Sequence, residues 1–304
     1  RFGADEIYFV RNMQAQPAQV TAAFRVGDKQ PELWCPLTGN VHSCAVYEQI
    51  GDLVRVPLTF AEHGSLFVVF RATSPKNHLV DADENLSIVG TQNGNVRVEA
   101  RENGSYQMRS SNGRDISLNV KELPDPLMVK GPWKLGFLNG RGAPSLISID
   151  RLKSWTDFDQ QGIRFYAGIG RYETEFELPA SWCRESRRVW LDLGELWAVG
   201  RVSVNGSAAD VVWTPPHQID ITESVRSGSN QLVVEIANTW SNRLVGDAGL
   251  PEEQRIGRTN ITRSGTPGKP WKEVPLHESG LLGPVTLIPS VELSISLLEG
   301  VDTE

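Results

Sequence analysis

The chain has 304 residues, of which 39% are hydrophobic and 22% charged, and its formal net charge is −7. This is the composition of a globular chain that is long enough for two domains of ordinary size. Acidic and basic residues are mixed along the whole length without a basic patch, and the longest apolar run, residues 66–70, is strand-sized. These two features argue against a nucleic-acid partner and against a membrane-spanning helix, which needs about 20 apolar residues.

The first part of the chain is predicted to be a series of short antiparallel strands. Almost no segment has helical periodicity, and apolar runs of strand length are followed by turn residues. Pairs such as Asn103-Gly104 and Asn112-Gly113 form tight hairpin turns because they tolerate positive φ. The expected strands are residues 7–10, 20–26, 53–60, 64–70, 86–89, 96–100, 106–109 and 116–120. We therefore predict an antiparallel β-sandwich over residues 1–126.

Pro124 and Pro126 interrupt this pattern, as expected of a connection between domains, because proline fixes φ and removes a ladder donor. Beyond them the expected strands become longer, at residues 172–178, 189–193, 201–204, 219–222, 231–237, 285–288 and 291–297. Only residues 180–184 and 252–255 are candidates for a helical turn. The predicted fold class is all-β, with a second antiparallel sandwich over residues 127–304.

Metal and redox chemistry find little support in the sequence. Cys35, Cys44 and Cys183 form no CxxC pair; Cys35 and Cys44 either bridge, if their strands are adjacent, or are buried free thiols. The histidines show no ligand spacing for zinc. We predict no cofactor and no metal centre, and only a structural calcium ion, for which the acidic loop at residues 81–85 is a weak candidate, is left open.

A composite pattern covers about seventy residues of the second domain and resembles a known sugar-binding module. The stretches that carry it are Tyr166–Pro179, Val189–Glu195, Val202–Gly206, Ile219–Thr222 and Gly228–Leu232. They resemble the sugar-binding jelly-roll domain of glycoside hydrolase family 2. The resemblance implies that the second domain is a galactose-binding-like jelly roll.

A second resemblance extends over nearly the whole chain. It rests on Trp240–Asp247 and Ser279–Val285, and on the earlier stretches Asp5–Val10, Pro31–Trp34, Ser65–Phe70 and Gly131–Trp133. These resemble the region of glycoside hydrolase family 106, the α-L-rhamnosidases, that follows the catalytic barrel. An all-β chain of this length has no room for such a barrel, so the family's catalytic residues have no counterparts here.

The family resemblance carries further expectations. It implies a carbohydrate ligand, a role in polysaccharide degradation, a catalytic barrel of the same parent protein as partner, and a bacterial, secreted or periplasmic origin. The chain begins at Arg1 without a signal-like apolar segment, which we interpret as a processing site or a boundary inside a larger protein.

Two acidic residues are the weak candidates for catalysis. Glycoside hydrolysis needs two carboxyl groups about 5–10 Å apart, and Asp247 and Glu278 lie in a segment, about 241–280, that is rich in Gly, Pro, Arg and Thr. In one hypothesis they form an acid/base pair. In the other, Asp247 binds Arg243 or backbone N–H groups, and Glu278 is a turn residue.

Sugar binding requires aromatic platforms and polar groups for the hydroxyls. Four tryptophans at expected strand ends or in loops are candidates, with four polar residues near them in sequence: Trp197, Trp213, Trp240, Trp271, His217, Asn242, Arg243 and Asp247. The alternatives for these tryptophans are core packing or a domain interface. Trp133, Trp155 and Trp190 are assigned to the core.

Three hypotheses for function follow. The first is a carbohydrate-binding accessory portion of a rhamnosidase-like glycoside hydrolase that lacks the barrel. The second is an autonomous glycosidase without a barrel, which uses carboxylates of residues 247–278. The third is a scaffold that binds no sugar. The family resemblance favours the first.

Overall fold

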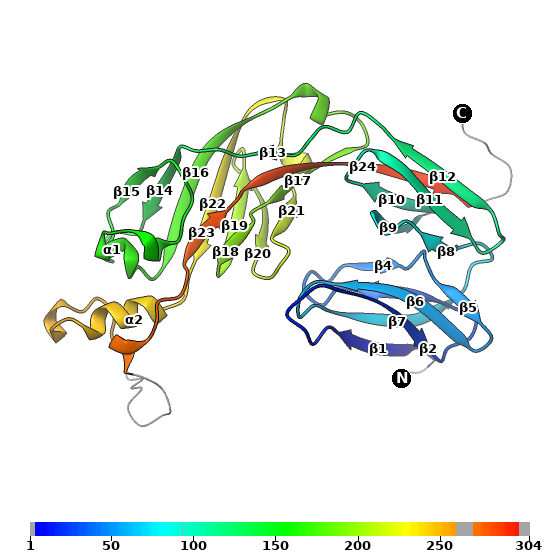
Figure 1. The fold of residues 1–304 in the computed structure, drawn as a ribbon, viewed down its shortest axis with the longest axis horizontal. Helices are drawn as coiled ribbons and strands as arrows, with labels where there is room; N and C mark the ends of the chain where they lie inside the picture. Colours follow the sequence, from blue (N-terminus) through cyan, green and yellow to red (C-terminus); the bar gives the residue numbers. More distant parts are fainter. Residues whose placement is uncertain (1–3, 93, 260–269, 298–304) are drawn as a thin grey trace. The chain divides into compact units, whose positions relative to one another are not determined.

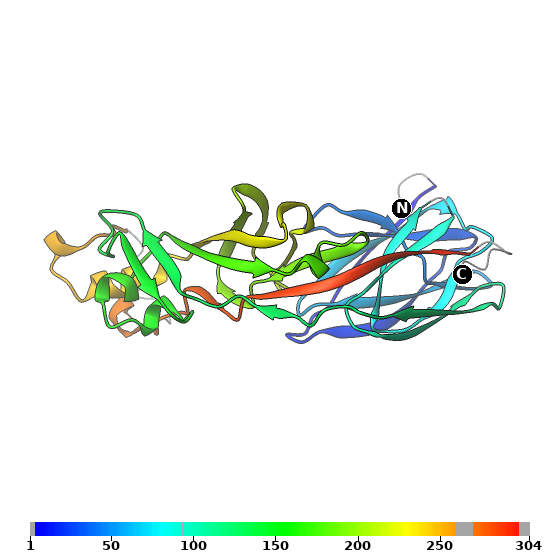
Figure 2. The same cartoon turned by 90° about the horizontal axis from the view of Figure 1, so that it is seen from above.

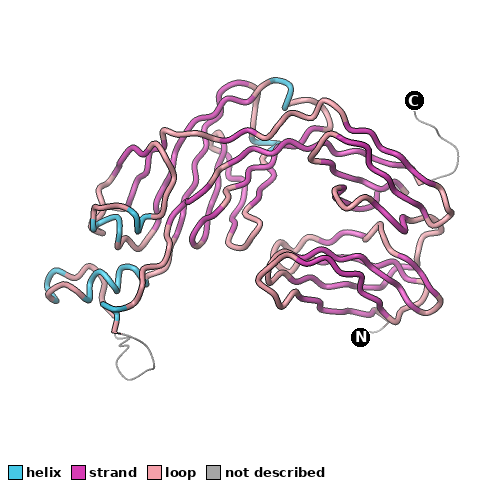
Figure 3. Tube along the Cα trace, viewed as in Figure 1, coloured by secondary structure: helices cyan, strands magenta, loops and turns pink. Residues whose placement is uncertain are grey.

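The computed structural model describes residues 4–92, 94–259 and 270–297. Antiparallel strands dominate it (Figure 3), which confirms the all-β fold class. The chain divides into two compact units: unit 1 comprises Arg1–Pro124 and Ser290–Glu304, and unit 2 comprises Asp125–Pro289. The last strand, β24 (Thr286–Ser296), therefore belongs to both units. The predicted second domain, residues 127–304, contains all of β24, because strand patterning does not reveal pairing partners.

Unit 1 begins with a sandwich of two antiparallel sheets. Its strands are β1 (Glu6–Arg11), β2 (Ala18–Phe24), β3 (Lys29–Trp34), β4 (Val41–Ser43), β5 (Glu48–Ile50), β6 (Leu53–Phe60) and β7 (Ser65–Thr73). One sheet has the order β1-β7-β3-β4 and the other has the order β2-β6-β5. Every second residue of β6 is buried, as expected of a strand with one solvated face. The rings of Tyr8, Phe24 and Phe70 pack together in the core.

Unit 1 contains a second core that the sequence did not separate from the first. Its strands are β8 (Leu79–Ala82), β9 (Leu86–Gln92), β10 (Asn95–Ala100), β11 (Gly104–Ser110) and β12 (Asp115–Val120). β10 pairs with β9 on one side and with residues 291–296 of β24 on the other. Val96 and Val98 share this core with Ile295. The region predicted as one sandwich, residues 1–126, thus buries two apolar clusters and takes in a strand from the far end of the sequence.

Unit 2 is built around a six-stranded antiparallel sheet. Its strands are β13 (Leu127–Met128), β14 (Trp133–Phe137), β15 (Leu146–Ile149), β16 (Ile169–Leu178), β17 (Arg187–Asp192), β18 (Glu195–Trp197), β19 (Val199–Val204), β20 (Ser207–Val212), β21 (Gln218–Asp220), β22 (Gly228–Ala237) and β23 (Gly280–Gly283). The large sheet has the order β15-β14-β16-β22-β19-β20 (Figure 1). β21, β17 and the start of β24 are neighbours in another sheet, with β13 beside β24, and β18 pairs with β23. The jelly-roll assignment of this unit stays a prediction.

Helices in unit 2 are short. They are α1 (Gln161–Arg164), α2 (Ser241–Ala248) and 3₁₀ turns at Trp155–Asp157, Ala180–Trp182, Thr222–Ser224, Glu252–Gln254 and Trp271–Glu273. The two predicted helical turns are confirmed, whereas α2 was not predicted. Both views show α1 and α2 at the same end of unit 2 (Figures 1 and 2). Among the described residues no helix is long and apolar enough to cross a membrane.

The core of unit 2 is centred on a buried tyrosine hydroxyl. The Tyr172 hydroxyl accepts hydrogen bonds from Trp155 Nε1, at 2.6 Å, and from the backbone N–H of Leu281, at 3.0 Å. Burial raises the pKa of this phenol. A Cβ at Gly280, whose φ is +94°, would collide with the indole of Trp155 and with the hydroxyl of Tyr172, so this close approach of the backbone requires glycine. One hydroxyl thus ties β16, the 3₁₀ turn at Trp155 and β23 together.

The core assignments of tryptophan are confirmed for two residues and wrong for one. Trp133 and Trp155 are buried. Trp190 is only half-buried, because alternation along β17 directs Val189 and Leu191 into the core and Trp190 to the other face. The cysteines are free thiols, and burial raises the pKa of Cys44 to about 12.

We expect Tyr172→Phe to destabilise the protein strongly while preserving its fold. The substitution removes the shared acceptor and leaves two buried donors unpaired, at about 1–3 kcal/mol for each donor. The free energy of unfolding, measured by urea denaturation, tests this. Tyr8→Phe is the matched control, because the contacts of Tyr8 in the core of unit 1 are made by its ring. An equal, small effect of both substitutions would contradict the role of the Tyr172 hydroxyl.

Candidate functional site

Three of the four predicted tryptophans gather at one end of the large sheet of unit 2. β19 pairs with β22 so that Val199 faces Ala237, and it pairs with β20 so that Gly200 faces Val212. Trp197 lies two residues before Val199, Trp213 directly follows Val212, and Trp240 lies three residues after Ala237. Strand register therefore brings residues that are up to 43 positions apart in sequence, from 197 to 240, to one end of the sheet. We call Trp197, Trp213 and Trp240 the tryptophan cluster.

The tryptophan cluster is open to solvent. Trp197 is 45% exposed, Trp213 56% and Trp240 71%. An indole ring is costly to leave in water, and exposed aromatic groups of this kind commonly mark binding surfaces. The structure thus assigns none of the three to the core, which was one of the alternatives for them.

His217 lies beside β18, and Trp271 lies beside α2, so both are near elements that adjoin the tryptophan cluster. His217 Nδ1 is 2.8 Å from the carbonyl oxygen of Gly194, just before β18. Because a carbonyl only accepts, Nδ1 is the donor in this contact. The 3₁₀ turn that contains Trp271 packs next to α2, which begins directly after Trp240. Trp271 itself is half-buried.

The side chain of Asn242 is buried and forms hydrogen bonds with residues 277 and 279. It is 2% exposed, and its Oδ1 accepts from the backbone N–H of His277 at 2.9 Å. Its Nδ2 donates to the carbonyl oxygen of His277 and to Oγ of Ser279. Since its side chain is fully engaged with residues 277–279, the predicted contact of Asn242 with a sugar is corrected: its role is to anchor α2.

Arg243 and Asp247 form a buried ion pair one turn apart on α2. Arg243 Nη2 is 3.0 Å from Asp247 Oδ1, and the guanidinium lies over the ring of Phe165. The Asp247 carboxylate also accepts from the backbone N–H groups of Ile256 and Gly257. Asp247 is 3% exposed. These contacts agree with the hypothesis in which Asp247 binds Arg243 and backbone N–H groups instead of acting in catalysis. Both side chains are buried, so they do not belong to the surface that a sugar would contact.

Gly246 lets this helix approach Phe165 closely. A Cβ at position 246 would lie 2.6 Å from Cγ of Phe165 and 2.7 Å from Nη2 of Arg243, distances that no real Cβ contact tolerates. The close contact of Gly246 with Phe165 and the buried polar side chains therefore fix the position of α2, which has no apolar stripe.

Glu278, the other catalytic candidate, is exposed. An acid/base pair requires two carboxyl groups that both reach the substrate, and a carboxylate already bound to a guanidinium and two backbone N–H groups does not do so. Residues 260–269, which belong to the proposed catalytic segment 247–278, lie outside the described residues. In the described parts of the chain, no three His, Cys, Asp or Glu side chains come together in a way that could hold a metal ion.

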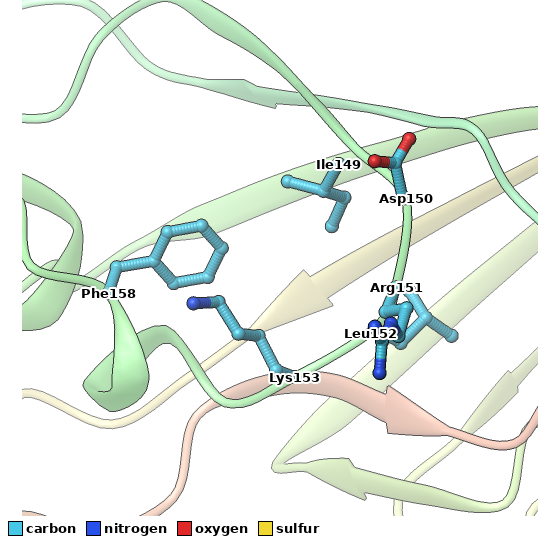
Figure 4. Close-up of a pocket in the computed structure, with 6 residues that line it drawn as sticks. All are labelled: Ile149, Asp150, Arg151, Leu152, Lys153 and Phe158. Atoms are coloured by element: carbon cyan, nitrogen blue, oxygen red, sulfur yellow. The ribbon is translucent and has the colours of Figure 1, made fainter.

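An open pocket of about 540 Å³ lies elsewhere in unit 2, at the end of β15 (Figure 4). Its apolar lining comes from Ile149, Leu152 and Phe158. Lys153 points across the ring of Phe158, with Nζ 4.1 Å from the ring centroid, and Asp150 turns away from it (Figure 4). No predicted site residue lines this pocket. The ammonium group of Lys153 already contacts the ring of Phe158 and donates to the carbonyl oxygen of Asp157.

Sequence reasoning missed the residues that position the site. Ser279 is buried and receives hydrogen bonds from Asn238 and Asn242, while its own N–H donates to Oγ of Ser154. Asn238 also donates to the carbonyl oxygen of Tyr166 and accepts from the N–H of Gly168. The only signal for these roles was the amide of Asn238 placed directly after a long apolar strand.

Comparisons with known proteins support the predicted resemblance. The model of the family described as alpha-L-rhamnosidase, glycoside hydrolase family 106, matches residues 1–49. The solved rhamnosidase of Novosphingobium sp. PP1Y is 31% identical and superposes with a TM-score of 0.72 over 95% of this chain and 23% of its own. The predicted resemblance to α-L-rhamnosidases is confirmed.

A second similar protein also bears the name of a glycoside hydrolase. A protein from Formosa agariphila, named "Putative beta-glucuronidase", is 27% identical over 264 residues, which are 81% of this chain and 22% of that protein. The chain thus spans less than a quarter of the length of either relative. It is related to glycoside hydrolases and corresponds to a minor part of them.

We expect Asp247→Asn to lower the free energy of unfolding by about 3 kcal/mol or more, because it leaves the buried guanidinium of Arg243 without its counter-charge. Glu278→Gln, at an exposed carboxylate, should change it by about 0.5 kcal/mol at most. Urea denaturation of both variants measures the difference. Equal stability of the two variants would contradict the structural role of the Arg243–Asp247 pair.

Proposed function

We propose that this chain is a carbohydrate-binding, non-catalytic β-portion of a rhamnosidase-like glycoside hydrolase, and that it binds sugar through the tryptophan cluster. The observation that carries the proposal is that the strand register places three exposed tryptophans near one end of one sheet. The apolar face of a pyranose ring stacks on such rings, and indole N–H groups can donate to its hydroxyls. His217 adds a polar imidazole ring beside β18.

The buried position of Asp247 supports a non-catalytic role. General acid/base catalysis requires a carboxyl group within hydrogen-bond reach of the substrate, and the oxygens of Asp247 are occupied by Arg243 and by backbone N–H groups. The second hypothesis, a glycosidase that uses carboxylates of residues 247–278, therefore loses one of its two candidate acids.

The size of the relatives supports an accessory role. Both are more than four times as long as the part they share with this chain, because that part is 22–23% of their length. In our proposal a catalytic barrel belongs to the same parent protein, and the parent acts on plant or microbial polysaccharide in a secreted or periplasmic location. The third hypothesis, a scaffold without sugar affinity, differs from ours only in the tryptophan cluster.

Sugar binding by the tryptophan cluster is expected to be weak, with a Kd in the range of about 1 μM to 1 mM that is typical of sites with few contacts. Trp240→Ala should weaken it about tenfold or more, because an exposed indole is the kind of side chain that dominates such interfaces. Glycan-array screening followed by titration calorimetry measures this. Leu146→Ala, at an apolar residue of β15 with 60% exposure, is the control. Equal affinity of both variants, or no glycan bound at all, would favour the scaffold.

Hydrolysis by the purified chain is expected to be absent. A panel of aryl glycosides that includes an α-L-rhamnoside tests this, with Glu278→Gln as the informative variant because a substitution at this exposed carboxylate is expected to preserve the fold. Reproducible turnover that this substitution abolishes would overturn the accessory role and establish a glycosidase without a barrel.

A further inference from the structure

The outer face of the first sheet of unit 1 carries a row of large apolar side chains across all four strands. The inner face of this sheet packs Leu66, Val68 and Phe70 into the core, so alternate residues point outward. The strand register places Phe9 opposite Phe67, Phe67 opposite Trp34, and Trp34 opposite Val41. Ile7 lies on the same side of β1, two residues before Phe9. We call Ile7, Phe9, Phe67, Trp34 and Val41 the aromatic strip.

Three members of the aromatic strip are exposed to solvent, and the other two, Phe67 and Trp34, are half-buried between them. Phe9 is 56% exposed, Val41 50% and Ile7 43%, and the rings of Phe9 and Phe67 lie in contact with a centroid separation of 5.0 Å. A contiguous apolar surface of this kind on a sheet face marks an interaction site rather than a scatter of single residues.

The polar groups at the border of the strip are already satisfied by one another. Glu32 accepts from Trp34 Nε1 through one oxygen and from Arg71 Nε through the other, both at 2.9 Å. The guanidinium of Arg71 lies over the Trp34 ring, 5.3 Å from its centroid. This network fixes the indole, neutralises the carboxylate and leaves an apolar centre with a polar border, the organisation of a protein–protein interface.

The geometry does not suit a sugar. The planes of Phe9 and Phe67 are inclined by 51°, so they form no flat platform. Arg71 covers a face of Trp34, whose N–H already donates to Glu32. A pyranose needs a free ring face and free polar groups for its hydroxyls, whereas an apolar protein surface needs neither.

We infer that the aromatic strip is the surface on which unit 1 docks against the catalytic part of its parent enzyme. The match to the rhamnosidase family model, residues 1–49, contains β1, β3 and β4, three of the four strands that form the strip. The solved rhamnosidase continues for more than three quarters of its length beyond the shared part, so a large partner surface exists in a protein of this kind. The inference rests on the proposed function, since it names the partner of the accessory portion.

Chemical labelling of the strip tests the inference. Ile7→Cys and Ile50→Cys are matched variants, because both isoleucines are 43% exposed and lie in unit 1, but Ile50 belongs to β5 in the other sheet. Each variant is made in the isolated chain and in the full-length parent enzyme. Maleimide modification is followed by peptide mass spectrometry, with the exposed Cys183 as an internal reference for reagent activity.

We expect the thiol introduced by Ile7→Cys to react about tenfold or more slowly in the parent enzyme than in the isolated chain, as for a site exposed in about a tenth of molecules or fewer. Ile50→Cys should react at similar rates in both. Equal rates for Ile7→Cys in the two proteins would overturn the inference. Protection that already occurs in the isolated chain and rises with its concentration would assign the strip to a second copy and overturn it as well. Neither result depends on sugar binding, so failure here is distinct from failure of the proposed function.

Discussion

The tryptophan end of unit 2 depends on a small buried network around Ser279. Asn238, at the end of β22, and Asn242, on α2, both donate to its hydroxyl, and its backbone N–H donates to Ser154. The network therefore ties one strand end, one helix and one turn to the segment that leads into β23. Buried polar groups of this kind specify a single arrangement when each has a partner, because any alternative leaves donors or acceptors unpaired.

The helix α2 connects the tryptophan cluster to the buried polar groups of unit 2. The helix starts immediately after the most exposed tryptophan of the cluster, Trp240, and is held by Asn242, by the Arg243–Asp247 pair and by the close contact of Gly246 with Phe165. Three of the polar side chains suggested as sugar ligands, Asn242, Arg243 and Asp247, thus hold the helix that follows Trp240. Hydrogen-bonding residues near an aromatic group can serve either purpose, and only burial distinguishes the two.

The fold was predictable where patterning is local. Alternation along β6 and β16, the Asn-Gly turns and the prolines at 124 and 126 are visible in the sequence, and they indicate antiparallel strands in two regions. The helix α2 was not predictable, because its buried positions are Asn242, Arg243 and Asp247, so no apolar periodicity marks it. The two cores of unit 1 and the dual membership of β24 were hidden for another reason: they depend on pairing between residues far apart in sequence, which no local signal encodes.

The dual membership of β24 has a consequence for the order in which the chain folds. Val96 and Val98 share a core with Ile295, Arg97 bonds Glu292 across 195 positions, and Asn77 bonds the carbonyl oxygen of Leu297 across 220. During synthesis from the N-terminus, the second core of unit 1 therefore remains open until residues 291–297 have left the ribosome, whereas the first sandwich has all its strands after residue 73. The unit that is begun first thus contains a core that is completed only after unit 2 has been made. Contacts of such long range are slow to form, so the exposed edge of β10 is the stretch that a nascent chain must protect the longest.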